Sequence, residues 1–259
     1  GIYNRIVKDF TGRPLSFELV TWVDAPPGSG LGSSSTLVTA VLGAFVEWLR
    51  IPLGEYDLAF LAYLIERKDI GYSGGKQDQY AATFGGVNFM EFYADDKVIV
   101  NPLRIRNEVL NELAFNMVLY YTGTSRLSSL IIEKQQDSIR QQKQTSVEAM
   151  HKTKEMATLM KESLLRGELD TIGHLMHEGW QYKKQMAEGI SNETIDRIYE
   201  TARQAGALGG KISGAGGGGY MFFYCPGTSR YRVTEELQHL GGVTAPFSFT
   251  KNGLNSWIL

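Results

Sequence analysis

The chain has 259 residues, of which 43% are hydrophobic and 21% charged, and its formal net charge is −2. This balance excludes a general electrostatic attraction to nucleic acid or to an anionic membrane. The single cysteine excludes an internal disulfide framework, and no stretch has the length of an apolar membrane span. We therefore expect a soluble, cytoplasmic protein with no nucleic-acid or membrane partner.

The first half of the chain predicts a strand followed by helices and a pair of strands. Apolar and polar residues alternate from 15 to 23, a pattern typical of a strand. The long apolar run 33–49 predicts a buried helix, which the proline at position 52 would end. Further elements are expected as helices at 56–68 and 76–84 and as strands at 86–92 and 98–101.

The second half is dominated by helical periodicity. Residues 114–121 predict a strand, and the polar run 137–144 indicates a solvated helix face or a linker. Apolar stripes at helical spacing and a closing strand–helix–strand pattern complete the chain, at 147–164, 172–179, 195–205, 220–224, 231–240 and 243–249. We expect two α+β lobes, 1–108 and 109–259.

A glycine-rich string joins the first predicted strand to the long helix. It reads Pro-Pro-Gly-Ser-Gly-Leu-Gly-Ser-Ser-Ser over residues 26–35 and has neither Walker nor dinucleotide-fold spacing. Glycines let the backbone approach a ligand closely, and the first amides of a helix attract anions. Serine hydroxyls there can also ligate Mg²⁺. The string predicts a phosphate site, and the alternative is a turn with a serine helix cap.

Two strings in this order resemble motifs of the galactokinase, homoserine kinase, mevalonate kinase and phosphomevalonate kinase superfamily, the GHMP kinases. Residues 26–35 resemble its second motif, P-x-x-x-G-L-G-S-S-A, with Ser35 at the usual alanine, a change from which we expect no consequence. The run KISGAGGGGY at 211–220 resembles its third motif. The resemblance implies a two-lobed α+β fold, with an ATP-binding β/α lobe at 1–108 and a ferredoxin-like lobe with added helices at 109–259.

The family's first motif has no match here, so the resemblance implies an N-terminal lobe truncated at its start. We expect that the chain is part of a longer polypeptide. The strings at 65–67, 74–82 and 121–126 are similar to the branch that acts on D-glycero-D-manno-heptose 7-phosphate. That branch phosphorylates the anomeric hydroxyl to the 1,7-bisphosphate, for nucleotide-activated heptose and surface polysaccharide. The alternatives are a fucose or galactose kinase and a non-catalytic sensor.

The resemblance also implies roles for individual residues. Ser34 and Glu66 match residues that hold Mg²⁺, and Asp78 matches a catalytic aspartate that takes or orients the hydroxyl proton. Their alternatives are a plain helix cap for Ser34, a solvated charge for Glu66 and a first-turn acid for Asp78. ATP is expected at Pro27, Gly28, Gly30, Leu31, Gly32, Ser33, Ser34 and Ser35.

The acceptor sugar phosphate is expected at the third glycine run, where Ser213, Gly214, Ala215 and Gly216 are the candidates. A phosphorylated acceptor also requires cationic donors, for which Arg126 and then Lys76 are the choices. Alternatively, Arg126 is a surface arginine without a ligand. The expected partners are ATP and the sugar phosphate, and a homodimer is left open.

Overall fold

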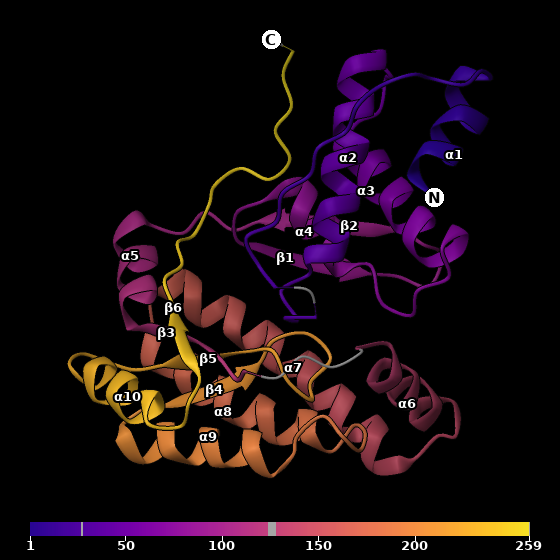
Figure 1. Ribbon diagram of the computed structural model, residues 1–259. Coiled ribbons are helices and arrows are strands. Elements are labelled where there is room, and N and C mark those ends of the chain that lie inside the picture. The colour runs from indigo at the N-terminus through magenta and orange to yellow at the C-terminus, as the bar shows by residue number, and fades with distance from the viewer. Residues whose placement is uncertain (27, 124–127, 259) are drawn as a thin grey trace. The chain divides into compact units, whose positions relative to one another are not determined.

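The computed structural model describes residues 1–26, 28–123 and 128–258, which divide into two compact units (Figure 1). Unit 1 holds residues 1–27, 32–103 and 250–259, and unit 2 holds residues 28–31 and 104–249. With two lobes continuous in sequence, segment 28–31 would belong to unit 1 and segment 250–259 to unit 2. Each of these short segments belongs to the other unit instead. No described helix is long and apolar enough to cross a membrane.

Unit 1 is built on helices around one apolar core. Its helices are α1 (Ile2–Ile6), α2 (Ser33–Leu49), α3 (Glu55–Leu64) and α4 (Gln77–Phe84), and π-helical turns follow α1 and α3, η1 (Val7–Thr11) and η2 (Ile65–Asp69). The predicted helices at 33–49, 56–68 and 76–84 are confirmed. Their apolar faces meet in the core, which includes Ile6, Val38, Leu42, Phe45, Leu58 and Ile65.

A two-stranded antiparallel sheet completes unit 1. Strands β1 (Asn88–Phe92) and β2 (Val98–Pro102) pair from Asn88 opposite Pro102 to Phe92 opposite Val98, so both predicted strands are confirmed. The inward side chains of β2 pack with Ala59 of α3 and Tyr80 of α4. This contact fixes α4, which carries two candidate site residues, against α3.

The predicted strand at 15–23 is wrong. Every strand of the described residues lies in one of the sheets formed by β1 to β6, and none of them pairs with this segment. Val20 and Trp22 are 84% and 86% exposed. The alternating pattern describes a pleated surface, but a strand also needs a neighbouring strand for its backbone hydrogen bonds.

Unit 2 is a four-stranded antiparallel sheet in the order β4-β5-β3-β6. Its strands are β3 (Met117–Tyr121), β4 (Gly209–Ile212), β5 (Tyr220–Tyr224) and β6 (Val243–Ala245). The strand predicted at 114–121 begins later because its first residues end a helix, and the one predicted at 243–249 keeps only the three residues that pair with β3. Strand β4 was not predicted.

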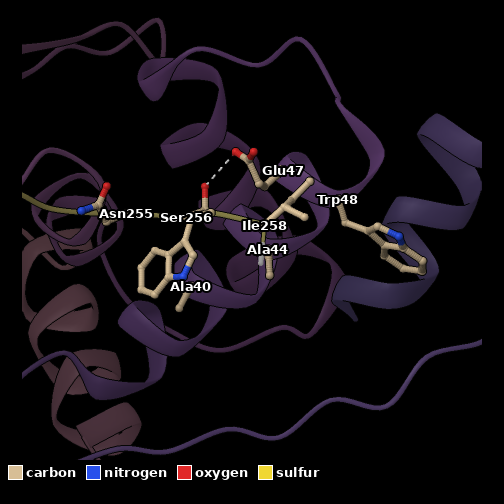
Figure 2. A pocket seen from close by; sticks show the side chains of 8 residues that line it. Ala40, Ala44, Glu47, Trp48, Asn255, Ser256 and Ile258 are labelled. Carbon is tan, nitrogen blue, oxygen red and sulfur yellow. Dashed lines mark hydrogen bonds between the residues drawn. The ribbon is translucent and has the colours of Figure 1, made fainter.

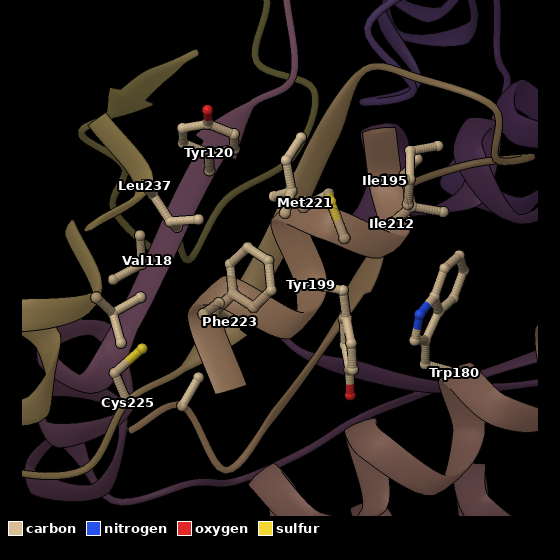
Figure 3. Packing of buried hydrophobic residues seen from close by; sticks show 14 of the residues in the cluster. Val118, Tyr120, Trp180, Ile195, Tyr199, Ile212, Met221, Phe223, Cys225 and Leu237 are labelled. Carbon is tan, nitrogen blue, oxygen red and sulfur yellow. The ribbon is translucent and has the colours of Figure 1, made fainter. Parts of the chain in front are cut away.

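Helices cover both faces of this sheet. Met221 and Phe223 of β5 pack with the apolar faces of α9 (Glu193–Ala205) and α10 (Ser229–Gln238) (Figure 3). Their neighbours Phe222 and Tyr224 join the cluster on the other face, formed with α5 (Asn107–Asn116), α7 (Gln144–Arg166) and α8 (Leu169–Lys184). Burial on both faces explains why β5 is apolar without alternation. Helix α6 (Ser128–Arg140) contains the first half of the polar run 137–144, a turn follows, and α7 begins at the last residue of the run. The fold is α+β as expected.

Candidate active site

The N-terminus of α2 is open. Gly32 is its cap residue with φ +73°, and no side chain of the described residues caps the helix. Ser34 is exposed, Ser35 is 2% exposed, and both donate their hydroxyl protons to another element instead of capping. The interpretation of Ser34 as a cap is therefore wrong. The free amides at the start of this 17-residue helix attract an anion.

Glu66 accepts the hydrogen bonds from both serine hydroxyls. Ser34 Oγ donates to its Oε1 at 2.8 Å, and Ser35 Oγ donates to its Oε2 at 2.6 Å. Gln79 Nε2 of α4 also donates to Oε2, at 2.6 Å. The Glu66 side chain lies in the π-helical turn η2 and is 2% exposed. A solvated surface charge is thus excluded, and π-helical turns frequently occur at functional sites.

Arg67 offsets the burial of this carboxylate. Its Nη1 lies 3.5 Å from Glu66 Oε1, and its Nε donates to the Gly75 carbonyl oxygen at 3.1 Å. A Cβ on Gly74 would stand 2.5 Å from the guanidinium carbon, so a side chain at this position would make the Arg67 side chain shift. Burying a carboxylate is costly unless it is paired and hydrogen-bonded, and Glu66 has both kinds of partner.

Asp78 lies in the first turn of α4 and is half-buried. Burial raises its pKa, and the charge of Glu66 acts in the same direction. A hydrogen bond from Gln77 and the charge of Arg67 act in the opposite direction and do not cancel the rise. The carboxylate is therefore a stronger proton acceptor than an ordinary exposed aspartate.

In unit 2 the first and third glycine groups lie against each other. Ser213 Oγ donates to the Gly30 carbonyl oxygen at 2.8 Å, and the Tyr220 amide donates to the Ser29 carbonyl oxygen at 3.0 Å. A Cβ on Gly30 would stand 2.8 Å from the Ser213 carbonyl oxygen, and one on Gly219 would stand 2.3 Å from that of Ser29. These two glycines are needed because two backbones approach closely.

The other residues expected near the sugar lie on the same loop. Ala215 accepts a hydrogen bond from Gln135 Nε2 through its carbonyl oxygen at 3.3 Å. Gly216 is buried, has φ +114° and packs against Ile190. Gly214 accepts a hydrogen bond from Lys183 at the end of α8.

Sequence reasoning missed Lys183. Burial, together with the charge of Lys211, lowers its pKa to about 7. It belongs to no motif, and helical spacing alone does not show which charged residue of a last turn faces a glycine loop.

Of the two cationic candidates for binding an acceptor phosphate, the structure describes Lys76 but not Arg126. Lys76 forms an ion pair with Asp96, and its ammonium lies 4.9 Å from the centre of the Tyr63 ring. Its charge is thus already partnered inside unit 1. Arg126 lies outside the described residues, as does Pro27 among the residues expected near ATP.

Each unit gathers part of the predicted site. Unit 1 brings together Gly32, Ser34, Ser35, Glu66 and Asp78, and Ser33 begins the same helix. Unit 2 brings Gly30 together with Ser213 and Gly214, and Gly28 and Leu31 flank Gly30 in its chain segment. An anion-binding helix end beside a hydroxyl–carboxylate pair is typical of an enzyme that acts on phosphorylated ligands.

The donor set also fits a magnesium ion. Magnesium prefers oxygen ligands and is usually held by one or two carboxylates together with substrate phosphates. No cluster of three or more histidine, cysteine, aspartate or glutamate residues occurs in the described part of the chain. The Ser34–Glu66 pair at the open helix end supplies such oxygens, with the phosphates of a nucleotide as further ligands.

A pocket elsewhere in unit 1 contains none of these residues. It measures about 250 Å³ and lies between α2 and the C-terminal segment, where Ser256 Oγ donates to Glu47 Oε2 at 3.2 Å (Figure 2). Ala40, Ala44 and Trp48 line its α2 side. The pocket thus lies on α2 but is not part of the site predicted at the start of that helix.

Comparisons with known proteins agree with this class. Residues 2–86 match the GHMP kinases N terminal domain, and residues 160–242 match the GHMP kinases C terminal domain. The chain belongs to the GHMP kinases, a family of phosphotransferases.

Individual relatives extend the comparison. The chain is 52% identical over 99% of its length to a D-glycero-alpha-D-manno-heptose 7-phosphate kinase of Campylobacter jejuni, of which it covers 75%. It is 42% identical to the crystal structure of a D-glycero-D-manno-heptose 1-phosphate kinase from Bacteroides thetaiotaomicron, with a TM-score of 0.82, covering all of this chain and 73% of that one. A galactokinase of Lactococcus lactis shares the fold at 19% identity and a TM-score of 0.67, over 88% of this chain and 68% of that one.

Proposed function

We propose that this protein is an ATP- and Mg²⁺-dependent sugar kinase that phosphorylates the anomeric hydroxyl of D-glycero-D-manno-heptose 7-phosphate. The observation that carries the proposal is the cluster at the start of α2, where an open helix end, the Ser34–Glu66 pair and the Asp78 carboxylate occur together in unit 1. The family supplies the reaction class, and the 52% identical relative supplies the substrate.

The chain's own residues meet three requirements of phosphoryl transfer, which depends on positioning and charge neutralisation. The backbone amides at the start of α2 bind phosphate oxygens, and the segment from Gly28 to Ser35 is the proposed phosphate-binding segment. Ser34 and Glu66 would hold Mg²⁺, which neutralises phosphate charge when bound. Asp78 accepts or orients the proton of the acceptor hydroxyl, and its raised pKa suits that task.

The remaining assignments of the site are part of the same proposal. Segments 1–108 and 109–259 are proposed as an ATP-binding lobe and a C-terminal lobe. Ser213, Gly214, Ala215 and Gly216 are proposed to contact the sugar, with Lys76 and Arg126 near its phosphate. We place the reaction in the cytoplasm and its product on a route to nucleotide-activated heptose for surface lipopolysaccharide. A homodimer stays open, and size-exclusion chromatography with light scattering tests for it.

The two close relatives carry names that differ in the substrate phosphate. One name places the phosphate on position 7 and the other places it on position 1. A kinase that adds a phosphate to the anomeric hydroxyl needs position 1 free, which supports the 7-phosphate as substrate. The experiment must therefore identify the position that gains the phosphate.

The test measures ADP release with a panel of acceptors and determines the product by phosphorus NMR. We expect turnover with the heptose 7-phosphate, a new anomeric phosphate resonance and much slower turnover with unphosphorylated heptose. Preference for fucose or galactose would show that the protein is a fucose or galactose kinase instead. ATP binding without turnover of any acceptor would show that it is a non-catalytic sensor.

Ser34→Ala, with Thr36→Ala as the matched control, connects the reaction with the cluster. Thr36 is exposed on the same turn of α2, and its hydroxyl donates to the Gly32 carbonyl oxygen at 3.0 Å. We expect the Mg²⁺ dependence of turnover to change in Ser34→Ala and to stay as in the parent in Thr36→Ala. The same dependence in both variants would contradict the assignment of Ser34.

A further inference from the structure

The carboxylate of Glu66 is held unequally at its two oxygens. Oε2 accepts hydrogen bonds from Ser35 Oγ and from Gln79 Nε2, each at 2.6 Å. Oε1 accepts one hydrogen bond, from Ser34 Oγ at 2.8 Å, and faces the more distant Arg67 Nη1 at 3.5 Å. A carboxylate oxygen has two lone-pair sites, so Oε2 is saturated and Oε1 keeps one site available.

The donors on Oε2 are themselves locked in place. Gln79 is fully buried, and its Nε2 also lies 3.1 Å from Ser35 Oγ, so that Ser35, Gln79 and Glu66 form a closed triangle of hydrogen bonds. Gln79 Oε1 is buried without a hydrogen-bond partner in the described structure. An unpaired buried carbonyl costs free energy. The Gln79 side chain therefore donates a hydrogen bond from its amide nitrogen to Glu66 while its own Oε1 stays unpaired.

We infer that Ser35 and Gln79 are positioning residues that saturate Glu66 Oε2 and so make Glu66 a one-oxygen ligand, through Oε1, for the cation beside Ser34. This inference rests on the proposed function for the presence of the cation. It assigns a consequence to Ser35, the position at which no consequence was expected. Partners that fix the orientation of a metal ligand typically affect metal affinity by about 10- to 100-fold.

The experiment removes one donor at a time with Ser35→Ala and Gln79→Met. Thr39→Val is the matched control, because Thr39 is 1% exposed one turn further along α2 and its Oγ1 has no hydrogen-bond partner in the described structure. Each variant is compared with the parent by thermal unfolding without metal, which measures the purely structural effect of the change.

The main readout is binding of Mn²⁺ to the protein–ADP complex, followed by electron paramagnetic resonance without any turnover. We expect the Mn²⁺ dissociation constant to rise about tenfold in Ser35→Ala and in Gln79→Met, and to stay within about twofold of the parent in Thr39→Val. Affinity for metal-free ADP should stay at the parent value in Gln79→Met and in Thr39→Val. The Mg²⁺ concentration for half-maximal velocity should rise in parallel, with an unchanged KM for the sugar phosphate.

Unchanged Mn²⁺ affinity in folded Ser35→Ala and Gln79→Met overturns the inference, and a role in folding alone would give that result. If one variant does not fold, the other decides. Failure of the proposed function is recognised separately, because a parent that binds Mn²⁺–ADP but transfers no phosphate to any sugar still reports on Glu66. A parent that binds no Mn²⁺ with ADP contradicts both.

Discussion

The backbone of Gly32 lies directly against the side chain of Asp78. A Cβ on Gly32 would stand 3.1 Å from Asp78 Cγ and 3.4 Å from its Oδ1. Gly32 also has φ +73°, a conformation that side chains disfavour. The residue that opens α2 and the residue proposed to receive the hydroxyl proton are thus placed by one contact inside unit 1.

The first prediction concerns that contact. Gly32→Ala should destabilise the protein by more than the ~1–2 kcal/mol that a left-handed alanine costs, because Asp78 must also move. The rate should fall as well, since the displaced carboxylate is the proposed proton acceptor. Urea unfolding and steady-state kinetics measure both effects.

Gly12→Ala is the control for this change. Gly12 has φ +63° but nothing within 4 Å of its position for a Cβ, so it reports the cost of backbone conformation alone. Equal destabilisation and normal turnover in both variants would mean that the Gly32–Asp78 contact has no functional weight.

The second prediction separates rate from stability at Asp78. Asp78→Asn should lower kcat by about 10²–10⁴ while ATP affinity changes little, as is typical when a general base is lost. Its raised pKa means that the folded protein holds this proton more tightly than the unfolded chain. The ionised form therefore lowers stability above that pKa, and Asp78→Asn should be as stable as the parent or more stable at pH 7.

The check is thermal unfolding at pH 7 and pH 4, with exposed Asp95→Asn as the control. The stability advantage of Asp78→Asn should shrink towards pH 4, because the raised pKa makes the folded parent take up this proton at a higher pH than the unfolded chain does. Near-normal kcat in Asp78→Asn would leave Asp78 as an orienting or first-turn residue.

The third prediction concerns the charge of Lys183. Its pKa is lowered to about 7, so between about pH 7 and its ordinary value near 10.5 the unfolded chain binds more protons than the folded protein. The contribution of Lys183 to stability therefore rises with pH across this window. Lys183→Met should gain most relative to the parent at pH 6 and least at pH 10.

Melting temperatures of both proteins across that range measure the effect. Lys184→Met is the control, because Lys184 is a neighbour on the same helix whose ammonium lies 3.7 Å from Asp196 Oδ1. A pH-independent difference between Lys183→Met and the parent would show that Lys183 does not titrate in this window.

The fourth prediction concerns Ser213, whose hydroxyl proton is committed to Gly30. Ser213→Ala should cost about 1 kcal/mol of stability through that lost hydrogen bond. It should also raise the KM for the sugar phosphate, because Ser213 is proposed to contact the acceptor. A rise in the KM for ATP alone would contradict that contact and would mean that Ser213 acts only through the Gly30 segment.

The parts of the fold that were predictable are those whose pattern reflects local structure. The run Ser33–Leu49 is long and mainly apolar and has clear signals at its ends, and α2 has those same bounds. The alternating segment 15–23 failed because strand formation depends on a partner elsewhere in the chain. Strand β4 was missed because Gly209 and Gly210 suggest a loop, although both are buried beside β5.

For the candidate site, motif spacing identified Ser34, Glu66 and Asp78 but not how they are held. The hydrogen bonds that Ser35 and Gln79 give to Glu66 span 31 and 13 residues. Such distances carry no periodic signal. Burial decides which of two neighbouring serines faces inward, and burial becomes visible only once the helices are packed.

The arrangement of unit 1 has a consequence for the order of folding during synthesis. The Leu254 amide donates to the Thr83 carbonyl oxygen at 3.0 Å, and Leu254 packs against Gly43 of α2, where a Cβ would stand 2.6 Å from its side chain. On a ribosome, α2 is therefore made early, but its neighbour Leu254 is made only after all of unit 2, which ends at residue 249. Unit 2 can begin to fold before the core of unit 1 has all of its residues.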